Sequence, residues 1–291
     1  MIINQNSLKN NLENNGFIFI PKLLSENEVK NISKYVIENS NDKNETFTIA
    51  LFNKKSGKLD KIHRDSINII NQIDNISNLT KSMKLVGDSS TISRIDAYSS
   101  YLSSEPVLPW HNDRAFSGDK VIHNKVQNRL FSFKAFVYLT DSIKSNGSLA
   151  YLPKSHLISS ALRSLIRKNI IPYEPFWSLK DFFDLVNRKK VIEALLDLNK
   201  FSISTLDQFK RDVEFILLNP TTTKFDISGS KGDCILFDER GFHRGGRPAI
   251  SNRRVLRIFY LNGAGKYENE PITDYGKIMK DKSIGEFKSK I

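Results

Sequence analysis

The chain has 291 residues, 39% of them hydrophobic, so it can bury a sizeable core as one large domain or two small ones. Its net charge is +12, and its single cysteine, Cys234, excludes both an intramolecular disulfide and a cysteine-rich zinc site. The sequence has no run of about 18 apolar residues, and its N-terminus lacks the apolar centre of a signal peptide. We therefore expect a cytoplasmic protein without a membrane span.

Two helices and one short strand are expected near the N-terminus. An amphipathic helix should end at Gly16, and the apolar stretch "FIFI" (17–20) predicts a buried strand. Ser25 and Glu28 have the spacing of a capping box, which predicts the start of a second helix. Residues 40–65 are polar, and we expect loops there.

Strands dominate the middle and the C-terminal part of the chain. Residues 91–102 and 130–141 have β character, and a turn at 144–148 leads into "LAYLPKSH". Residues 157–230 are largely helical and interrupt the series, which resumes with "TTKFDISG", "DCILFD" and "RVLRIFYLN". This order predicts an all-β core with helices packed around it, and not the strand–helix alternation of a parallel α/β sheet.

The stretch "LPWHNDRAF" (108–116) contains a histidine and a carboxylate two residues apart. In an extended chain, His111 and Asp113 project from the same face, so they could form a surface salt bridge, part of a proton relay or two thirds of a metal site. His243 follows a strand and is flanked by glycines, which let the backbone approach a ligand closely. Two histidines and one carboxylate make a facial triad that leaves open positions on Fe(II), whereas a closed zinc site needs a fourth protein ligand.

The other three histidines are expected to be structural or solvated. His63 and His123 lie in polar stretches, where solvent exposure is expected. His156 lies at a strand-to-helix turn, where a structural hydrogen bond is the better interpretation.

The order and spacing of these motifs resemble those of the phytanoyl-CoA dioxygenase family of Fe(II)- and 2-oxoglutarate-dependent oxygenases. The family pattern "WH.D", "NG.L..LPGSH" and "GD..LF….H", followed by an arginine eleven residues later, is matched by "WHND", "NGSLAYLPKSH", "GDCILFDERGFH" and Arg254. Lys154 stands where the family often has glycine. The resemblance implies a mainly β fold with flanking helices, in which a double-stranded β-helix (a jelly-roll, cupin-like core) forms a single domain over residues 1–291.

The resemblance also implies the catalytic residues and the cofactors. His111, Asp113 and His243 would hold Fe(II), while 2-oxoglutarate as co-substrate and O2 would take the open positions. Arg254 would bind the distal carboxylate of 2-oxoglutarate, because a guanidinium group matches a carboxylate in bidentate geometry. By strand alternation, Arg253 and Arg257 are expected to point to the opposite face from Arg254.

Strand alternation suggests further contacts with the co-substrate and the substrate. If Phe136 lines the barrel, so does Lys134, and a lysine in such a strand is unexpected unless it meets an anion. Lys134, Phe136 and Tyr98 are therefore candidates for co-substrate binding, with an exposed lysine as the alternative for Lys134. Arg94 shares a face with Tyr98 and is a candidate substrate contact.

The densest basic stretch suggests an anionic ligand. Its six arginines have no acid between the first and the last: Arg240, Arg244, Arg247, Arg253, Arg254 and Arg257. Arg244 and Arg247 directly follow His243, so we hypothesise that they contact an anionic group of a small-molecule substrate. We expect the insertion at 157–230 to lie near the barrel mouth, where its aromatic residues either form a wall over the pocket or pack against the barrel: Tyr173, Phe176, Trp177, Phe182 and Phe183.

The predicted function is hydroxylation of an unactivated C–H bond, with succinate and CO2 as co-products. Asp113 favours hydroxylation over halogenation, because halogenating relatives have a small residue at that position. Two alternatives remain. One is a nucleic-acid demethylase of the same superfamily, which the net charge invites but the arginine spacing disfavours; the other is a catalytically silent metal-binding protein on the same barrel. The sequence defines neither the substrate nor the oligomeric state.

Overall fold

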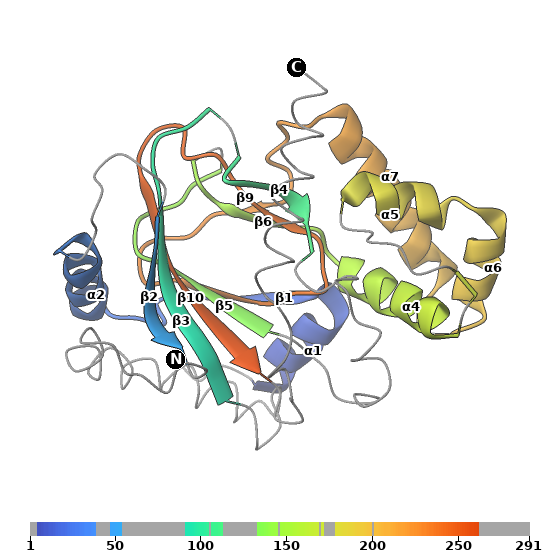
Figure 1. Ribbon diagram of the computed structural model, residues 1–291, viewed down its shortest axis with the longest axis horizontal. Coiled ribbons are helices and arrows are strands. Elements are labelled where there is room, and N and C mark those ends of the chain that lie inside the picture. Colours follow the sequence, from blue (N-terminus) through green and yellow to red (C-terminus); the bar gives the residue numbers. More distant parts are fainter. Residues whose placement is uncertain are drawn as a thin grey trace.

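The computed structural model describes residues 5–38, 47–53, 91–104, 106–112, 133–144, 146–168, 170–171, 178–199 and 201–261. Two antiparallel sheets lie across from each other, and helices flank them on both sides (Figure 1). This confirms the expected mainly β fold with flanking helices. His63, His123, Asp113, Tyr173, Phe176 and Trp177 lie outside the described residues.

The two sheets differ in size. The larger has six strands in the order β1 (Phe17–Ile20), β8 (Cys234–Asp238), β5 (Phe133–Tyr138), β10 (Arg253–Leu261), β3 (Thr91–Ser100) and β2 (Phe47–Asn53). The smaller has four, in the order β4 (Leu108–His111), β9 (His243–Gly245), β6 (Leu149–Tyr151) and β7 (Asp226–Ile227). Strands far apart in the sequence are therefore neighbours in both sheets, as a jelly roll requires.

The faces of the larger sheet pack into different cores. On the outer face, Ala135 and Leu256 pack in one cluster with Ile32 of α2 (Glu26–Glu38). On the inner face, Phe136 and Val255 pack in a second cluster that also contains side chains of the smaller sheet. Because side chains alternate along a strand, each residue of β5 and β10 can be assigned to one of these faces.

Local signals determine the ends of the first two helices as expected. α1 (Gln5–Asn15) ends at Gly16, whose φ of 85° is in the left-handed region and whose N–H donates to the carbonyl of Leu12 at 2.8 Å. At the start of α2, the Ser25 N–H donates to Glu28 Oε2 at 2.6 Å. The Glu28 N–H donates back to Ser25 Oγ at 3.4 Å, which completes the capping box.

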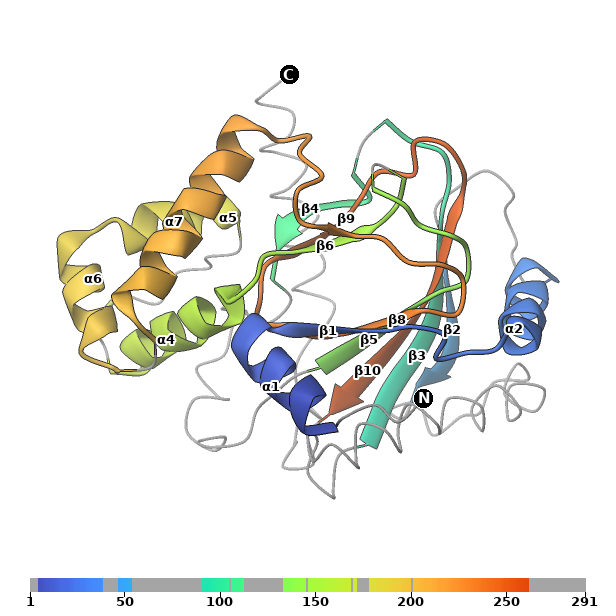
Figure 2. The same cartoon turned by 180° about the vertical axis from the view of Figure 1, so that it is seen from behind.

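Four helices between the strands form a unit with its own core, which we call the helical segment. They are α4 (Ser155–Arg167), α5 (Leu179–Val186), α6 (Lys189–Leu196) and α7 (Ile203–Leu218). They gather at one side of the molecule, whereas α2 lies at the opposite side (Figures 1 and 2). Their core includes Phe182, Phe209 and, from the barrel, Phe242, all 2% exposed or less.

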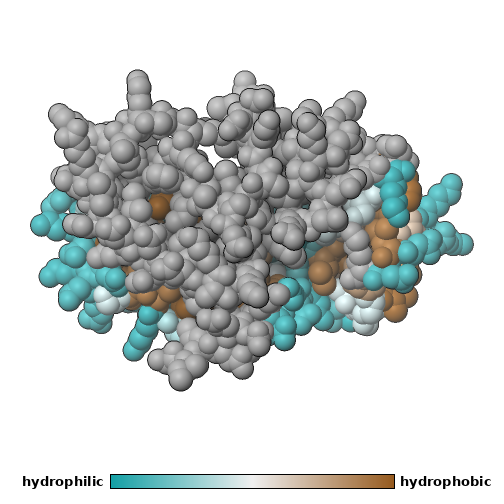
Figure 3. Space-filling view, turned by 90° about the horizontal axis from the view of Figure 1, so that it is seen from below, coloured by the Kyte–Doolittle hydropathy of each residue, from teal (hydrophilic) through white to brown (hydrophobic). Residues whose placement is uncertain are grey.

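The described surface is mixed in character. Where described residues are visible from below, hydrophilic side chains project at both ends of the molecule, with hydrophobic ones beside them (Figure 3). None of the described helices is both long and apolar enough to cross a membrane.

Candidate metal and co-substrate site

Two of the three expected metal ligands lie opposite each other in the smaller sheet. His111 ends β4, His243 begins β9, and the two are cross-strand partners. Their ring centroids are 4.4 Å apart, and both residues are buried, 3% and 4% exposed. The two strands therefore bring together histidines that are 132 residues apart in the sequence.

Hydrogen bonds to the backbone orient both imidazole rings. His111 Nδ1 lies 2.7 Å from the carbonyl oxygen of Pro109, and His243 Nδ1 lies 2.9 Å from that of Gly241. A carbonyl oxygen only accepts, so each Nδ1 carries a proton, which leaves Nε2 as the nitrogen that can bind a metal. This is the tautomer that a metal-binding histidine needs, with its other nitrogen held by an acceptor.

The donor set fits Fe(II) as far as the described residues extend. No group of three or more histidine, cysteine, aspartate or glutamate side chains gathers as a metal site within them, since Asp113 lies just beyond Asn112. Two imidazole nitrogens suit Fe(II), Ni(II) and Zn(II) alike, and a carboxylate two residues after His111 would complete a facial triad.

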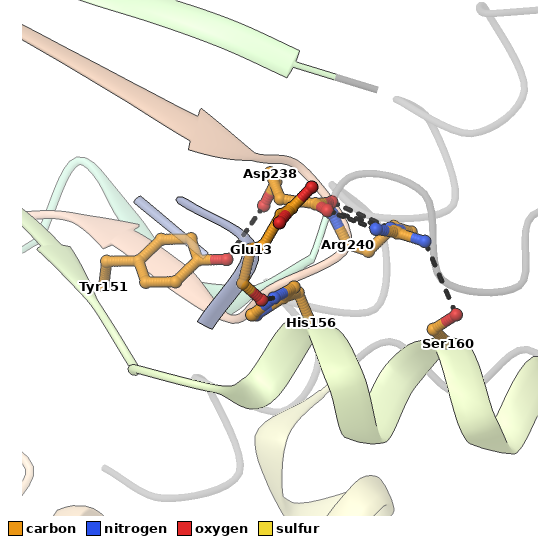
Figure 4. Close-up of polar contacts among 6 residues, drawn as sticks. All are labelled: Glu13, Tyr151, His156, Ser160, Asp238 and Arg240. Carbon is orange, nitrogen blue, oxygen red and sulfur yellow. Dashed lines mark hydrogen bonds and ion pairs between the residues drawn. The ribbon is translucent and has the colours of Figure 1, made fainter. Parts of the chain in front are cut away.

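A buried ion pair supports the corner between β8 and β9. Arg240 donates through Nε to Asp238 at 2.9 and 3.1 Å, and its Nη1 reaches Ser160 Oγ of α4 at 3.4 Å (Figure 4). Although burial raises the pKa of Asp238, the adjacent Arg240 lowers it further, and the net pKa is below its ordinary value. The carboxylate thus stays charged and keeps the turn before His243 in place.

Tyr151 and Gly241 fit tightly behind His243. The Tyr151 hydroxyl donates to the carbonyl of Asp238 at 3.1 Å (Figure 4). The ring of Tyr151 lies nearly parallel to that of His243, with the ring centroids 6.4 Å apart. A Cβ added to Gly241 would lie 1.8 Å from the Tyr151 oxygen, so only glycine fits at this position. The glycine before His243 therefore serves packing within the protein, and not the approach of a ligand.

His156 has the structural role that was expected. Its Nε2 donates to the carbonyl of Glu13 at 3.0 Å, which ties the start of α4 to α1 (Figure 4). Burial lowers the pKa of His156 below its ordinary 6.5, while the nearby Asp238 carboxylate opposes that shift. Lys154, two residues before His156, has a φ of 65°, so a lysine occupies a left-handed position that glycine adopts more easily.

Three of the six clustered arginines have acidic partners elsewhere in the chain. Arg240 pairs with Asp238, Arg244 with Asp226 at 3.4 Å and Arg257 with Asp96 at 2.5 Å, and the three acids are at least 92% buried. The anionic groups that the sequence suggested for this stretch are therefore, for these three, side chains of β8, β7 and β3.

Arg253 and Arg257 lie on the opposite face from Arg254, as expected, but the inner face is theirs and not that of Arg254. Arg254 pairs with Ser99 and shares the outer face of β10 with Leu256, so its side chain points away from the barrel interior. Arg253 and Arg257 are on the inner face, where their guanidinium groups lie 4.9 Å from the Phe136 ring and 4.6 Å from the Tyr98 ring. Spacing along the sequence does not distinguish two consecutive arginines, and the pairing of β10 with β5 and β3 does.

Arg253 is a buried cation without a counterion among the described residues. It is 2% exposed, its Nε and Nη2 make no hydrogen bond within the described part of the chain, and burial lowers its pKa to about 10. A buried charge is costly unless it is paired. Its Nη1 lies 3.3 Å from where a Cβ of Gly245 would be, next to the strand that carries His243. This arrangement fits a ligand carboxylate such as that of 2-oxoglutarate.

Lys134 points into the barrel, as alternation with Phe136 predicted. Its ammonium group lies 3.4 Å from Glu239 Oε1 and 4.8 Å from the centre of the Phe259 ring, and its side chain is only 9% exposed. The alternative of an exposed lysine is therefore wrong, and the anion that Lys134 meets is a side chain of the β8–β9 turn. Sequence inspection missed Glu239, although it lies only four residues before His243.

The remaining candidates are distributed differently from what was expected. Tyr98 lies on the inner face beside Arg257, whereas nothing is described of the Arg94 side chain. Arg244 is 5% exposed and bonded to the backbone of Pro220 and Thr222, so it is not available to an anionic substrate. Arg247 is exposed.

The helical segment lies behind the two histidines. Phe182 is fully buried in its core and Phe183 packs against that core, so neither forms a wall over the barrel interior. Ser178, next to Trp177, forms a backbone bridge with His111. The segment thus contacts the β4–β9 strand pair from its outer side.

Comparison with known proteins agrees with this architecture. The model of the phytanoyl-CoA dioxygenase (PhyH) family matches residues 12–170, more than half of the chain. No curated protein sequence matches the chain significantly.

Three solved structures illustrate the likeness of the chain to known folds. AviO1 from Streptomyces viridochromogenes Tue57 has a TM-score of 0.52 and 14% identity, over 91% of this chain and 98% of that one. The epimerase SnoN, in complex with Fe3+, alpha ketoglutarate and nogalamycin RO, has a TM-score of 0.51 and 14% identity, over 89% of this chain and 83% of that one. The third is HygX from Streptomyces hygroscopicus with nickel, 2-oxoglutarate and hygromycin B bound. Its TM-score is 0.50 at 14% identity, over 87% of this chain and 86% of that one. At these identities the likeness establishes a shared fold. The family match establishes that the chain belongs to the phytanoyl-CoA dioxygenase family and is an oxygenase that depends on iron and 2-oxoglutarate.

Proposed function

We propose that His111, Asp113 and His243 hold the iron, that Arg253 binds the distal carboxylate of 2-oxoglutarate, and that the enzyme hydroxylates a C–H bond of a small molecule. The observation that carries this proposal is the buried guanidinium of Arg253, which has no counterion among the described residues and lies on the inner face of the barrel with the two histidines. A dicarboxylate supplies the missing counterion, and the protein supplies a preformed fork of donors.

The residues around the two histidines and Arg253 have defined roles in this proposal. The Pro109 and Gly241 carbonyls keep Nε2 of His111 and His243 as metal donors. Phe136 packs under the Arg253 guanidinium, and Gly245 leaves room for it beside β9. Bound iron would supply the activation of O2, coupled to oxidative decarboxylation of 2-oxoglutarate.

We place the Lys134–Glu239 pair on the substrate side of the site. Lys134 reaches over the Phe237 ring at 5.8 Å, and that ring lies 4.8 Å from the ring of His243. Both charges of the pair are compensated within the chain, and so is the charge of Arg257, which pairs with Asp96 beside Tyr98. A neutral or zwitterionic substrate suits such lining better than an anion does.

The small-molecule class is favoured over nucleic acid by the location of the arginines. Arg240, Arg244 and Arg257 are engaged with aspartates of the chain, so this basic stretch does not form an open surface for phosphates. SnoN and HygX, with nogalamycin RO and hygromycin B bound, have small molecules in the same fold.

The metal and co-substrate assignment is tested by anaerobic titration. Wild-type apoprotein with Fe(II) and 2-oxoglutarate should develop a visible charge-transfer band, and His111→Ala and His243→Ala should not. In air, the wild type alone should form succinate from 2-oxoglutarate. A band or succinate formation that survives in His243→Ala would refute the assignment, and wild-type protein that forms no succinate would favour a silent metal-binding protein.

The reaction type is tested by the product. Hydroxylation adds one oxygen atom from O2 to the substrate, whereas an epimerase such as SnoN is named for leaves the mass unchanged. With a panel of small molecules and ¹⁸O2, a product that carries one labelled oxygen supports hydroxylation. A chlorinated product in chloride buffer would contradict the role of Asp113 as a ligand, since a carboxylate at that position leaves no site for chloride.

A further inference from the structure

Each candidate metal histidine is preceded by an aromatic residue that points to the opposite side of its strand. Trp110 precedes His111, and Phe242 precedes His243. Phe242 is fully buried in the core of the helical segment, with its ring 4.6 Å from that of Phe182, and Trp110 packs against the same core. The inner face of this strand pair thus carries the two histidines, and its outer face is fixed to the helices.

β4 depends on such contacts, because its backbone pairing is sparse. Within the described residues it is the edge strand of the smaller sheet, and its register partners in β9 are two, Leu108 with Gly245 and His111 with His243. The register is irregular between these pairs. Just before β4, the Val107 N–H also donates to the carbonyl of Gly245 at 3.0 Å. On the other side of the strand, the described residues show one bridge, between the backbones of His111 and Ser178 just before α5. Side chains must therefore supply much of what holds His111 at a fixed distance from His243.

Arg244 provides the most extensive of these contacts. Its guanidinium lies 5.2 Å from the centre of the Trp110 ring, so it joins the outer faces of β9 and β4. Nη1 donates to the carbonyl of Pro220 at 2.9 Å, and Nη2 donates to that of Thr222 and lies 3.4 Å from Asp226 Oδ1. One planar group thus links both histidine strands to β7 and to the end of α7, and lysine does not have this geometry.

We infer that Arg244 is a positioning residue that sets the spacing of His111 and His243 through Trp110, and that the helical segment serves as its support from behind the metal site. This inference rests on the proposed function, because it takes the two histidines as metal ligands. It replaces the role expected from the sequence, in which Arg244 contacted the substrate. Residues that orient metal ligands commonly change metal affinity about 10- to 100-fold when they are replaced.

The test uses Co(II) in place of Fe(II), so that no turnover is needed. Apoprotein is titrated with Co(II), and the dissociation constant and the visible ligand-field spectrum are recorded together with the thermal midpoint of the apoprotein. For Arg244→Met we expect a dissociation constant raised about tenfold or more and a changed spectrum. Arg244→Lys should not restore either property, because an ammonium group cannot donate to two carbonyls while it stacks on an indole.

Leu195→Ala is the matched control. Leu195 is fully buried in the helical core, so its truncation should lower the thermal midpoint but leave Co(II) affinity and the spectrum as in the wild type. Trp110→Leu removes the ring but not the bonds of Arg244 to Pro220 and Thr222, and it should also weaken Co(II) binding. It serves in place of Arg244→Met if that variant does not fold.

The outcomes separate the inference from the proposed function. If the wild type binds no Co(II), or His243→Ala binds it as tightly, the metal site itself is wrong. If those two proteins behave as expected and Arg244→Met or Trp110→Leu binds Co(II) like the wild type, only the positioning role is refuted. A loss of affinity in Leu195→Ala as large as in Arg244→Met would also refute it, because any loss of stability would then have the same effect.

Discussion

Arg253 and Arg254 are consecutive residues of β10 whose side chains lie on opposite faces of the larger sheet. The first packs over Phe136 inside the barrel, and the second shares the outer face with Leu256. Arg253 is buried without a counterion among the described residues, whereas Arg254 is partly exposed. Two residues with the same chemistry are therefore expected to behave differently toward a dicarboxylate.

Arg253→Met should weaken 2-oxoglutarate binding about 10- to 100-fold, because a charge-assisted hydrogen-bonded pair is lost. Arg254→Met should leave it near the wild-type value. The measurement is titration of the anaerobic Fe(II) protein with 2-oxoglutarate, followed through the charge-transfer band. If Arg254→Met weakens 2-oxoglutarate binding more than Arg253→Met does, Arg254 is the co-substrate residue, as its position eleven residues after His243 suggested.

Arg253→Met should weaken co-substrate binding without lowering the stability of the apoprotein. A buried cation without a partner is costly, and methionine fills similar volume without a charge. Apo Arg253→Met should therefore unfold at a temperature equal to or above that of the wild-type apoprotein. A large decrease would indicate that Arg253 is held by contacts within the chain and not prepared for a ligand.

Glu239→Gln should destabilise the protein by about 3–5 kcal/mol, because it leaves the buried ammonium of Lys134 without its carboxylate. The double variant Lys134→Met/Glu239→Gln should recover most of that loss, since it removes the buried charge as well. Urea unfolding of the two single variants and the double variant measures the coupling energy. Additive losses would show that the two side chains do not form an interacting pair in solution.

The pH dependence of stability should contain a contribution from His156. Burial lowers the pKa of His156 in the folded state below 6.5, so below that pH the unfolded state takes up a proton that the folded state does not. Stability should therefore fall as the pH drops from about 6.5 towards the lowered pKa. His156→Gln keeps a donor for the Glu13 carbonyl without titrating, so its urea midpoint should fall less between about pH 7.5 and about pH 5. Parallel curves for the two proteins would contradict this assignment.

Gly245→Ala should mainly weaken co-substrate binding, whereas Gly241→Ala should mainly lower stability. An added Cβ at Gly245 lies 3.2 Å from Val107 and 3.3 Å from Nη1 of Arg253, so it should shift the guanidinium and weaken 2-oxoglutarate binding with little loss of stability. At Gly241 the same atom overlaps the Tyr151 side chain, and we expect a stability loss of about 1–3 kcal/mol or more. Thermal unfolding of the apoproteins and 2-oxoglutarate titration separate the two effects. Equal co-substrate affinity in Gly245→Ala and the wild type would argue against a ligand beside Gly245.

The sequence by itself predicted the element types and singled out His111 and His243, the two histidines that the fold brings together. The capping box of Ser25 and Glu28, the left-handed Gly16 and the strand alternation of Lys134 with Phe136 are local properties, which depend on residues a few positions apart. The family resemblance rested on ordered motifs, and the match over residues 12–170 confirms it.

Only the tertiary structure decided which charged side chains face the site. A shift of one residue in a strand moves a side chain to the other face, and the register of β10 is set by β3 and β5, whose sequences lie more than a hundred residues earlier. The partners of Arg240, Arg244 and Arg257 come from three different strands, so half of the six positive charges in this stretch are paired with aspartates in the fold. Burial makes an unpaired charge costly, and among the described residues it distinguishes Arg253 from its neighbours. This is why Arg253 is the arginine that we propose for the co-substrate.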